Sequence, residues 1–313
     1  MTAAPASRGQ WALFAALGFF WGTSYLFIKI GVGSIPPFTL IAGRLGIGAL
    51  LLAAVAAAAR LRLPRQRRTW GHLLVMAVLN IVLPFTLITF GERSIESSLA
   101  AVLNSTVPLF TIVFAALAFS EEAVTVNRLL GLIVGFAGVV VVVGAGVASA
   151  GGGAGAGGST LGELAMIGSS ICYALGNVYA RRNVRSLDPM VPALLQVGLA
   201  FLIAAGLAIV IDAPWTLRPE PQALGAVAWL GVFGSGLAYL VYFRLLKAWG
   251  PTRASLVAYL LPVVGIVAGW LVLGEAVDGR IVAGTALVVG GIALVNSRRG
   301  VRRLYGRAAP SPE

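Results

Sequence analysis

Long apolar stretches alternate along the chain with short segments that carry charges, proline or glycine. Each stretch is roughly 20 residues long, which is the length that an α-helix needs to cross the ~30 Å hydrocarbon core of a bilayer. The pattern therefore predicts ten transmembrane helices. Their ranges are 11–32, 36–60, 70–91, 97–119, 126–147, 160–181, 189–212, 222–246, 251–273 and 279–297.

The two halves of the chain repeat one set of spacings. An acidic residue and two glycines, 9 and 7 residues apart, follow both the fourth and the ninth stretch. These residues are Glu122, Gly131 and Gly138 in the first half and Glu275, Gly284 and Gly291 in the second. Since each half has five helices, the second half enters the membrane from the opposite face. We therefore predict an all-α integral membrane fold in which ten transmembrane helices form two inverted five-helix repeats.

This repeat divides the chain into four segments. Residues 1–147 form the first five-helix repeat and residues 160–297 form the second. Between them, the glycine-rich residues 148–159 have the composition of a flexible coil. Residues 298–313 are a basic tail, which we expect to be cytoplasmic.

A net charge of +12 could reflect either nucleic-acid binding or the topology of a membrane protein, and the positions of the basic residues distinguish these two explanations. Only 11% of the residues are charged, against roughly 25% in soluble domains. Eighteen of the 23 lysines and arginines fall on the side of the membrane that holds the termini, four fall on the other side, and Arg44 lies within a stretch. Cytoplasmic segments are enriched in Lys and Arg. We therefore predict a multi-pass protein of the bacterial inner (plasma) membrane with both termini cytoplasmic, whose partner is the lipid bilayer and not nucleic acid.

Cysteine and histidine are too scarce for several kinds of chemistry. The chain has one cysteine, Cys172, and one histidine, His72, so neither a disulfide framework nor a His/Cys metal site is expected. We predict no metal, no cofactor and no catalytic residues.

Five short motifs occur in an order and spacing that resemble the drug/metabolite transporter superfamily, in its ten-helix form with two EamA domains. They are FWGTSYLFIK at 20–29, PLF at 108–110, SEE at 120–122, YLLPVV at 259–264 and LGE at 273–275. Ser120 departs from the glycine that usually precedes the acid, and the glycine-rich linker is unusually long. The resemblance covers nearly the whole chain and implies an export carrier for amino acids, nucleoside-like metabolites or drugs.

Arg44 is the strongest candidate for a binding residue because an arginine within a membrane helix is costly unless it is paired or faces water. It could clamp a substrate carboxylate through two hydrogen bonds. The alternatives are an ion pair with Glu92 or Glu96, or a side chain that extends to the membrane surface.

Other polar side chains also interrupt the apolar stretches. Trp21, Ser24 and Tyr25 share one helix face, and Tyr173 with Asn177 repeats this spacing. Such aromatics either line a cavity or form a belt at the membrane surface. The remaining predicted site residues, which could instead join helices by hydrogen bonds, are Asn80, Asn104, Gln196, Tyr239 and Tyr259.

All eleven acidic residues fall in predicted loops, in the tail or at helix ends, and Glu163 comes closest to the interior. The sequence therefore gives no positive sign of proton coupling.

Taken with the resemblance, these features predict a secondary transporter that works by alternating access on a small-molecule substrate. Arg44 and the aromatic residues favour export of amino acids or related compounds, and a multidrug or cationic-dye carrier is the alternative. A membrane-embedded enzyme for lipid-linked substrates is the alternative from another class, but the loops are short and carry no clustered nucleophile. A homodimer is left open.

Overall fold

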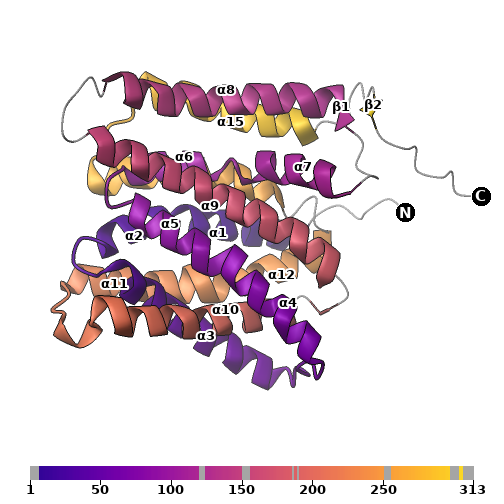
Figure 1. The fold of residues 1–313 in the computed structure, drawn as a ribbon, viewed down its shortest axis with the longest axis vertical. Coiled ribbons are helices and arrows are strands. Elements are labelled where there is room, and N and C mark those ends of the chain that lie inside the picture. The colour runs from indigo at the N-terminus through magenta and orange to yellow at the C-terminus, as the bar shows by residue number, and fades with distance from the viewer. Residues whose placement is uncertain are drawn as a thin grey trace, which may run out of the picture.

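The computed structural model describes residues 7–119, 124–149, 156–184, 187–188, 190–249, 255–296 and 303–305. Long helices lie side by side across the molecule and cross it from one edge to the other (Figure 1). The first half contains α1 (Arg8–Gly22), α2 (Ser24–Gly31), α3 (Pro37–Ala58), α4 (Arg67–Ala77), α5 (Leu83–Gly91), α6 (Ser97–Asn104), α7 (Val107–Ala118) and α8 (Val126–Ser149). The second contains α9 (Ala156–Asn183), α10 (Met190–Leu207), α11 (Pro221–Trp229), α12 (Ala238–Trp249), α14 (Leu260–Ala268) and α15 (Gly279–Asn296).

Short irregular segments continue several of these helices or connect them. Four are π-helical, namely η1 (Val78–Val82), η2 (Ala208–Asp212), η4 (Leu230–Leu237) and η6 (Gly269–Leu273). Two are 3₁₀-helical, namely η3 (Pro214–Thr216) and η5 (Ser255–Tyr259). The strands β1 (Val124–Thr125) and β2 (Arg303–Tyr305) pair antiparallel.

Within the described part of the chain, eight helical segments are long and apolar enough to cross a membrane. They are Arg8–Gly31, Pro37–Ala58, Arg67–Gly91, Ser97–Ala118, Val126–Val143, Met190–Asp212, Pro221–Trp249 and Leu256–Leu273. Of the other two predicted crossings, α15 is apolar over the shorter range Gly279–Val295, and α9 has 28 residues but includes Glu163, Arg181 and Arg182.

The two halves are arranged as an inverted repeat. The chain enters α1 at the edge where the termini lie, and enters α9 at the opposite edge (Figure 1). Equivalent helices of the two halves contact each other, α3 with α10 and α8 with α15. The first helix of each half also contacts the fourth of the other, α1 with α14 and α9 with α7. A two-fold axis in the membrane plane produces this reciprocal pairing, so the predicted all-α inverted-repeat architecture is confirmed.

The predicted linker differs from the structure at both ends. α8 continues to Ser149 and α9 begins at Ala156, so a coil at 148–149 and 156–159 was wrong. Extending an existing helix adds one hydrogen bond per residue without a new nucleation cost, which offsets the low helix propensity of glycine. The rest of the linker lies outside the described residues, as does the tail except for β2.

The repeated glycines explain how α8 and α15 approach each other. A Cβ atom on Gly138 would lie 2.8 Å from the carbonyl oxygen of Gly284, and one on Gly131 would lie 2.5 Å from that of Gly291. Small residues let membrane helices approach at backbone distance. In α1, Gly18 instead leaves room for a side chain, because a Cβ there would lie 2.6 Å from the Leu260 Cδ1 in α14.

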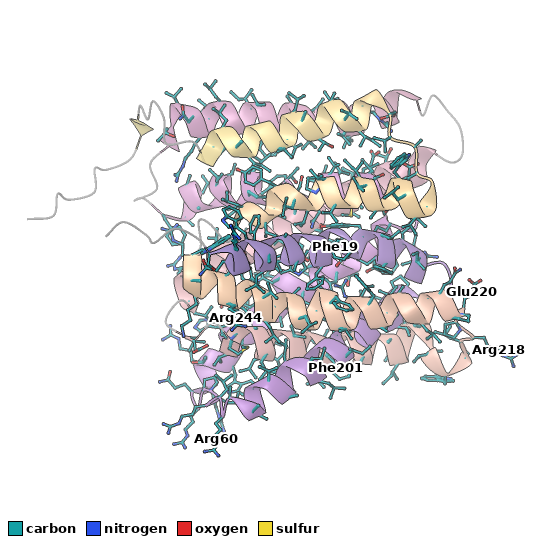
Figure 2. The ribbon with its side chains drawn as sticks, turned by 180° about the vertical axis from the view of Figure 1, so that it is seen from behind. Phe19, Arg60, Phe201, Arg218, Glu220 and Arg244 are labelled. Carbon is teal, nitrogen blue, oxygen red and sulfur yellow. The ribbon has the colours of Figure 1, made fainter. Side chains whose placement is uncertain are left out.

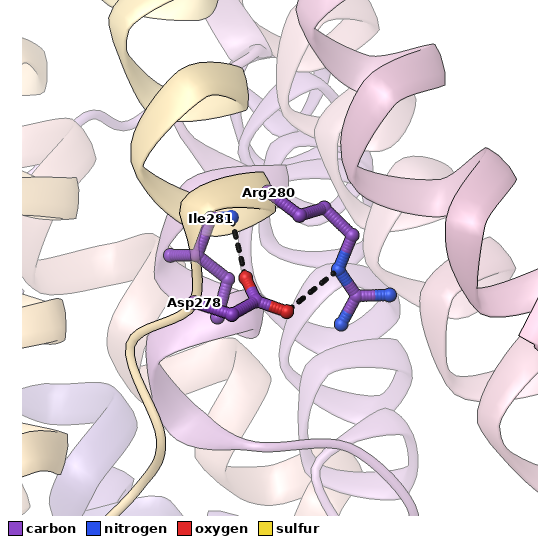
Figure 3. A network of polar contacts seen from close by, with 3 residues as sticks. All are labelled: Asp278, Arg280 and Ile281. Carbon is purple, nitrogen blue, oxygen red and sulfur yellow. Dashed lines mark hydrogen bonds and ion pairs between the residues drawn. The ribbon is translucent and has the colours of Figure 1, made fainter.

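Charged side chains mark the two edges of the bundle, and apolar rows lie between them. Arg60 and Arg244 lie towards one edge, and Arg218 and Glu220 lie at the other (Figure 2). At the latter edge Asp278 accepts a hydrogen bond from the Ile281 amide at 2.8 Å and pairs with Arg280 at 3.3 Å, which fixes the start of α15 (Figure 3).

Candidate functional site

A cavity of about 850 Å³ lies between the two halves. Ten of the eleven side chains predicted as site residues line it, although they come from distant parts of the sequence. They are Trp21, Ser24, Tyr25, Arg44, Asn80, Asn104, Tyr173, Asn177, Gln196 and Tyr239.

The lining residues show how the cavity is oriented. At one end it reaches Val184 and Leu187, which follow α9 at the edge where the termini lie. At the other end it stops at the buried Ile28 and Ile88, each three residues before the end of its helix. The cavity therefore reaches the edge with the termini, and the buried Ile28 and Ile88 separate it from the opposite edge, which is closed.

Prolines place two of the lining asparagines at breaks in their helices. Asn80 lies in η1, four residues before Pro84, and Asn104 ends α6, four residues before Pro108. Proline has no amide hydrogen, so the carbonyl groups of both asparagines lose the helical bond from four residues further on. Such interruptions recur at functional sites in membrane transporters.

The second half has an irregular segment at the place that corresponds to η1. There, η4 brings Gly234 to the cavity and Ser235 to Arg44. The Arg44 Nε donates a hydrogen bond to the Ser235 Oγ at 3.2 Å. The two π-helical segments therefore contribute polar groups to the same cavity from opposite halves.

Arg44 is held within the bundle and not at its surface. Only 3% of its surface is exposed, and its guanidinium carbon lies 4.2 Å from the centre of the Phe85 ring. Neither Glu92 nor Glu96 forms an ion pair with it, and among the described residues no carboxylate lies within 4.0 Å of its nitrogens. The predicted alternative of a structural ion pair is therefore not found.

Gly234 packs closely against the Arg44 guanidinium. A Cβ atom at this position would lie 3.1 Å from the Ser24 Oγ and 3.2 Å from the Arg44 Nη2. The absence of a side chain at this position thus lets the Arg44 Nη2 and the Ser24 Oγ lie close to the backbone of η4. The Ser24 hydroxyl donates to the Phe20 carbonyl oxygen at 2.9 Å, so a ligand carboxylate in the cavity could accept hydrogen bonds from the Arg44 guanidinium.

The polar amides divide into two kinds. Asn104 donates from Nδ2 to the Tyr25 hydroxyl at 2.6 Å, and its Oδ1 accepts from Ser169 and Ser170 at 3.0 and 3.3 Å. Its hydrogen bonds therefore join α2, α6 and α9, as expected of a side chain that holds helices together.

Two other amide oxygens are buried without a hydrogen-bond partner. They are the Oδ1 of Asn80 and the Oε1 of Gln196. Buried polar atoms are rarely left unpaired. Both side chains also line the cavity.

Aromatic rings form part of the wall. The Trp21 ring centre lies 6.3 Å from that of Tyr239 and 5.4 Å from that of Tyr242. All three line the cavity, which places them inside the bundle and not in a belt at the membrane surface.

Tyr259 is the one predicted site residue that does not line the cavity. It contacts the apolar cluster that contains Leu109 and Val288, near α7 and α15. Tyr259 ends the 3₁₀-helical η5, whose three residues per turn change the order in which side chains face inward. Val257 and Ala258 reach the cavity instead.

The structure buries acidic residues that the sequence placed at helix ends. Glu92 is 0% exposed, Glu163 1% and Glu275 8%. The sequence assigned all acids to loops or helix ends and gave no sign of burial, because the burial depends on contacts from distant helices. Glu275 caps α6 of the other half.

An inverted repeat with a polar-lined cavity between its halves defines a class of protein, the multi-pass membrane transporters. The family follows from the sequence. Residues 9–144 and 160–297 each match the EamA-like transporter family, and the chain belongs to that family.

Named relatives agree with this assignment. The uncharacterized transporter YvbV of Bacillus subtilis (strain 168) is 31% identical over 298 residues, with 91% of each chain covered. The uncharacterized inner membrane transporter YedA of Escherichia coli (strain K12) is 29% identical over 272 residues, with 85% of this chain and 83% of YedA covered. A solved crystal structure of another protein superposes on this chain with a TM-score of 0.65 at 22% sequence identity. The superposition covers 93% of this chain and 99% of the solved chain, so the two share the same fold.

Proposed function

We propose that this transporter exports amino acids or closely related zwitterionic metabolites by alternating access. The main support is Arg44, a buried cation that lines the cavity and has no ion-pair partner among the described residues. An unneutralised buried charge is costly, and a substrate carboxylate that arrives with each transport cycle would offset that cost.

The other groups of the cavity suit the rest of such a molecule. The unpartnered oxygens of Asn80 and Gln196 can accept hydrogen bonds from a substrate ammonium group. The aromatic and apolar wall can accommodate an uncharged side chain. A volume of about 850 Å³ lies within the roughly 300–1,000 Å³ typical of ligand cavities, so side chains of several sizes should fit.

The direction of transport is supported by the distribution of basic residues. The cavity extends to the edge with the termini, and we expect this edge to face the cytoplasm because it carries most of the lysines and arginines. In this conformation the site would be loaded from the cytoplasm. Opening of the opposite edge would then deliver the substrate outside.

The experiment is counterflow in proteoliposomes that contain the purified protein. We expect saturable exchange of labelled neutral amino acids, which Arg44→Ala abolishes and Arg44→Lys weakens because a lysine cannot form the bidentate contact. Arg60→Ala, at the exposed edge, is the matched control and should exchange normally.

Cationic dyes test the competing drug-carrier function. In a sensitive bacterium, overexpression should raise tolerance to toxic amino-acid analogues, and Arg44→Ala should remove it. Resistance to dyes without tolerance to the analogues would replace the amino-acid proposal by a drug-carrier function in which the aromatic wall binds the cation.

A further inference from the structure

Glu92 is a buried carboxyl group for which the proposed transport function has no role. It follows α5 at the closed edge of the bundle, is 0% exposed, and neither carboxylate oxygen has a hydrogen-bond partner. A buried carboxylate without partners is strongly disfavoured in its charged form, and the protonated acid is the cheaper state.

The charged groups around Glu92 come from several elements, and none forms an ion pair with it. Lys29 of α2 directs its ammonium group to the backbone, where Nζ donates to the carbonyl oxygens of Glu92 and Ile95 at 2.7 and 2.6 Å. Arg44 of α3 is engaged with Ser235. No described cation lies within 4.0 Å of the Glu92 carboxylate.

Two acids and a tyrosine complete this environment. Glu275 approaches from the segment before α15, Glu163 is buried in the first turns of α9, and Tyr25 lies on α2. Burial raises the pKa of Glu92 well above its ordinary value, Lys29 and Arg44 oppose this rise, and Glu275 adds to it. Burial is the largest of these effects.

Hydrogen bonds near Glu92 join several elements at this edge. Lys29 ties α2 to the segment from Glu92 to Ile95, and Glu275 ties the second half to the start of α6. If alternating access opens this edge, these contacts separate and water reaches the Glu92 carboxyl group. In water a glutamate ionises at about pH 4.3, so the open edge favours the carboxylate.

We propose that Glu92 is a proton-binding site coupled to this edge: closing the edge takes up one proton from solvent onto the carboxylate, and opening the edge releases it. The sign follows from linkage. A group that holds its proton more tightly in the closed form stabilises that form at low pH. This stabilisation is lost as the pH rises through the pKa that the group has in the closed form. An acidic exterior therefore favours the conformation described here. The proposal rests on alternating access but not on the identity of the substrate.

The test measures the conformation directly and needs no substrate. Spin labels are attached at the exposed Arg93 and Arg218, on the loops of this edge, in a Cys172→Ala background, and their distance distribution is recorded against pH. We expect the short-distance population to increase as the pH falls. Glu92→Gln, which resembles the protonated acid, should keep that population high at every pH, and the control Glu220→Gln, an exposed acid at the same edge, should retain the pH dependence.

An unchanged pH dependence in Glu92→Gln, or none in the unsubstituted protein, would overturn the proposal. If Glu92→Gln fails to fold, infrared spectroscopy of the protein with native Glu92 provides the second measurement. A protonated carboxyl band that persists at neutral pH and is lost in Glu92→Asp, or shifts there, supports the proposal. Complete ionisation of the carboxyl groups near pH 4 to 5, as for glutamates in water, contradicts it. Because neither measurement uses transport, a failed amino-acid assay would leave the proton site to be judged separately.

Discussion

The Oε1 atom of Glu275 accepts a hydrogen bond from the Ser97 amide at 2.7 Å, and its Oε2 accepts one from the neighbouring Ser98 amide at 2.9 Å. The first amides of a helix have no partner within it, and the helix dipole favours a negative charge at this end. One carboxylate of the second half therefore satisfies the start of α6 in the first half, at the edge opposite the termini.

Glu275→Gln should loosen this edge. A glutamine side chain has one acceptor oxygen, so one of the two bonds is lost and the other is no longer assisted by charge, at a cost of about 1–3 kcal/mol. We expect the spin-label distance between positions 93 and 218 to shift towards the open form. An unchanged distribution would show that this contact does not hold the edge closed.

Glu122 occupies the place of Glu275 in the first repeat and lies outside the described residues. If the repeat symmetry extends to the other conformation, Glu122→Gln should shift the same distance distribution in the opposite direction. Equal shifts of the same sign in Glu122→Gln and Glu275→Gln would contradict a reciprocal role for the two acids.

Gly138 tests the contact between α8 and α15. Its Cβ would lie 2.8 Å from the Gly284 carbonyl oxygen and 2.8 Å from the Val288 amide nitrogen, so Gly138→Ala must separate two backbones. We expect a loss of about 1–3 kcal/mol, measured as a lower thermal midpoint in detergent. Gly290→Ala in α15 is the control, because nothing lies within 4 Å of its added Cβ.

Ser235 positions Arg44 without a direct role in charge recognition. Ser235→Ala removes the hydrogen bond to Nε, which is worth about 0.5–1.5 kcal/mol, and should weaken substrate affinity by up to about tenfold. Exchange should persist at saturating amino acid. A complete loss of exchange would mean that the hydroxyl group contacts the substrate itself.

Reporter fusions test the orientation and the number of crossings. Reporters placed after residues 66, 186 and 313 should behave as cytoplasmic, and one inserted near Gly153 as external, because the basic residues are divided so unequally. External activity of the fusion at 313 would contradict ten crossings.

The sequence predicted the cavity residues well because polar side chains are costly in a membrane interior. Arg44, Asn80 and Gln196 stand out within apolar stretches, and these positions meet at the cavity. The glycine spacing likewise anticipated the repeat, and the repeated glycines of the two halves meet where α8 packs against α15.

Other features depend on geometry that no local pattern contains. Tyr259 carried the same signal as Tyr239, but the 3₁₀ turns of η5 place it away from the cavity. Glu92 ends an apolar stretch, where solvation is the natural expectation, and only the approach of distant helices buries it. Ser235 accepts a hydrogen bond from Arg44, which is 191 positions away in the sequence, so no local pattern could indicate its role.

The contact between α8 and α15 has a further consequence for how such proteins diversify. It is made largely by backbone against backbone, and among the described residues of these two helices Ile292 alone lines the cavity. Substitutions that alter which molecules the cavity accepts can therefore accumulate without disturbing the contact between α8 and α15. Transporters that share this fold can therefore come to carry different substrates through substitutions at the cavity wall alone.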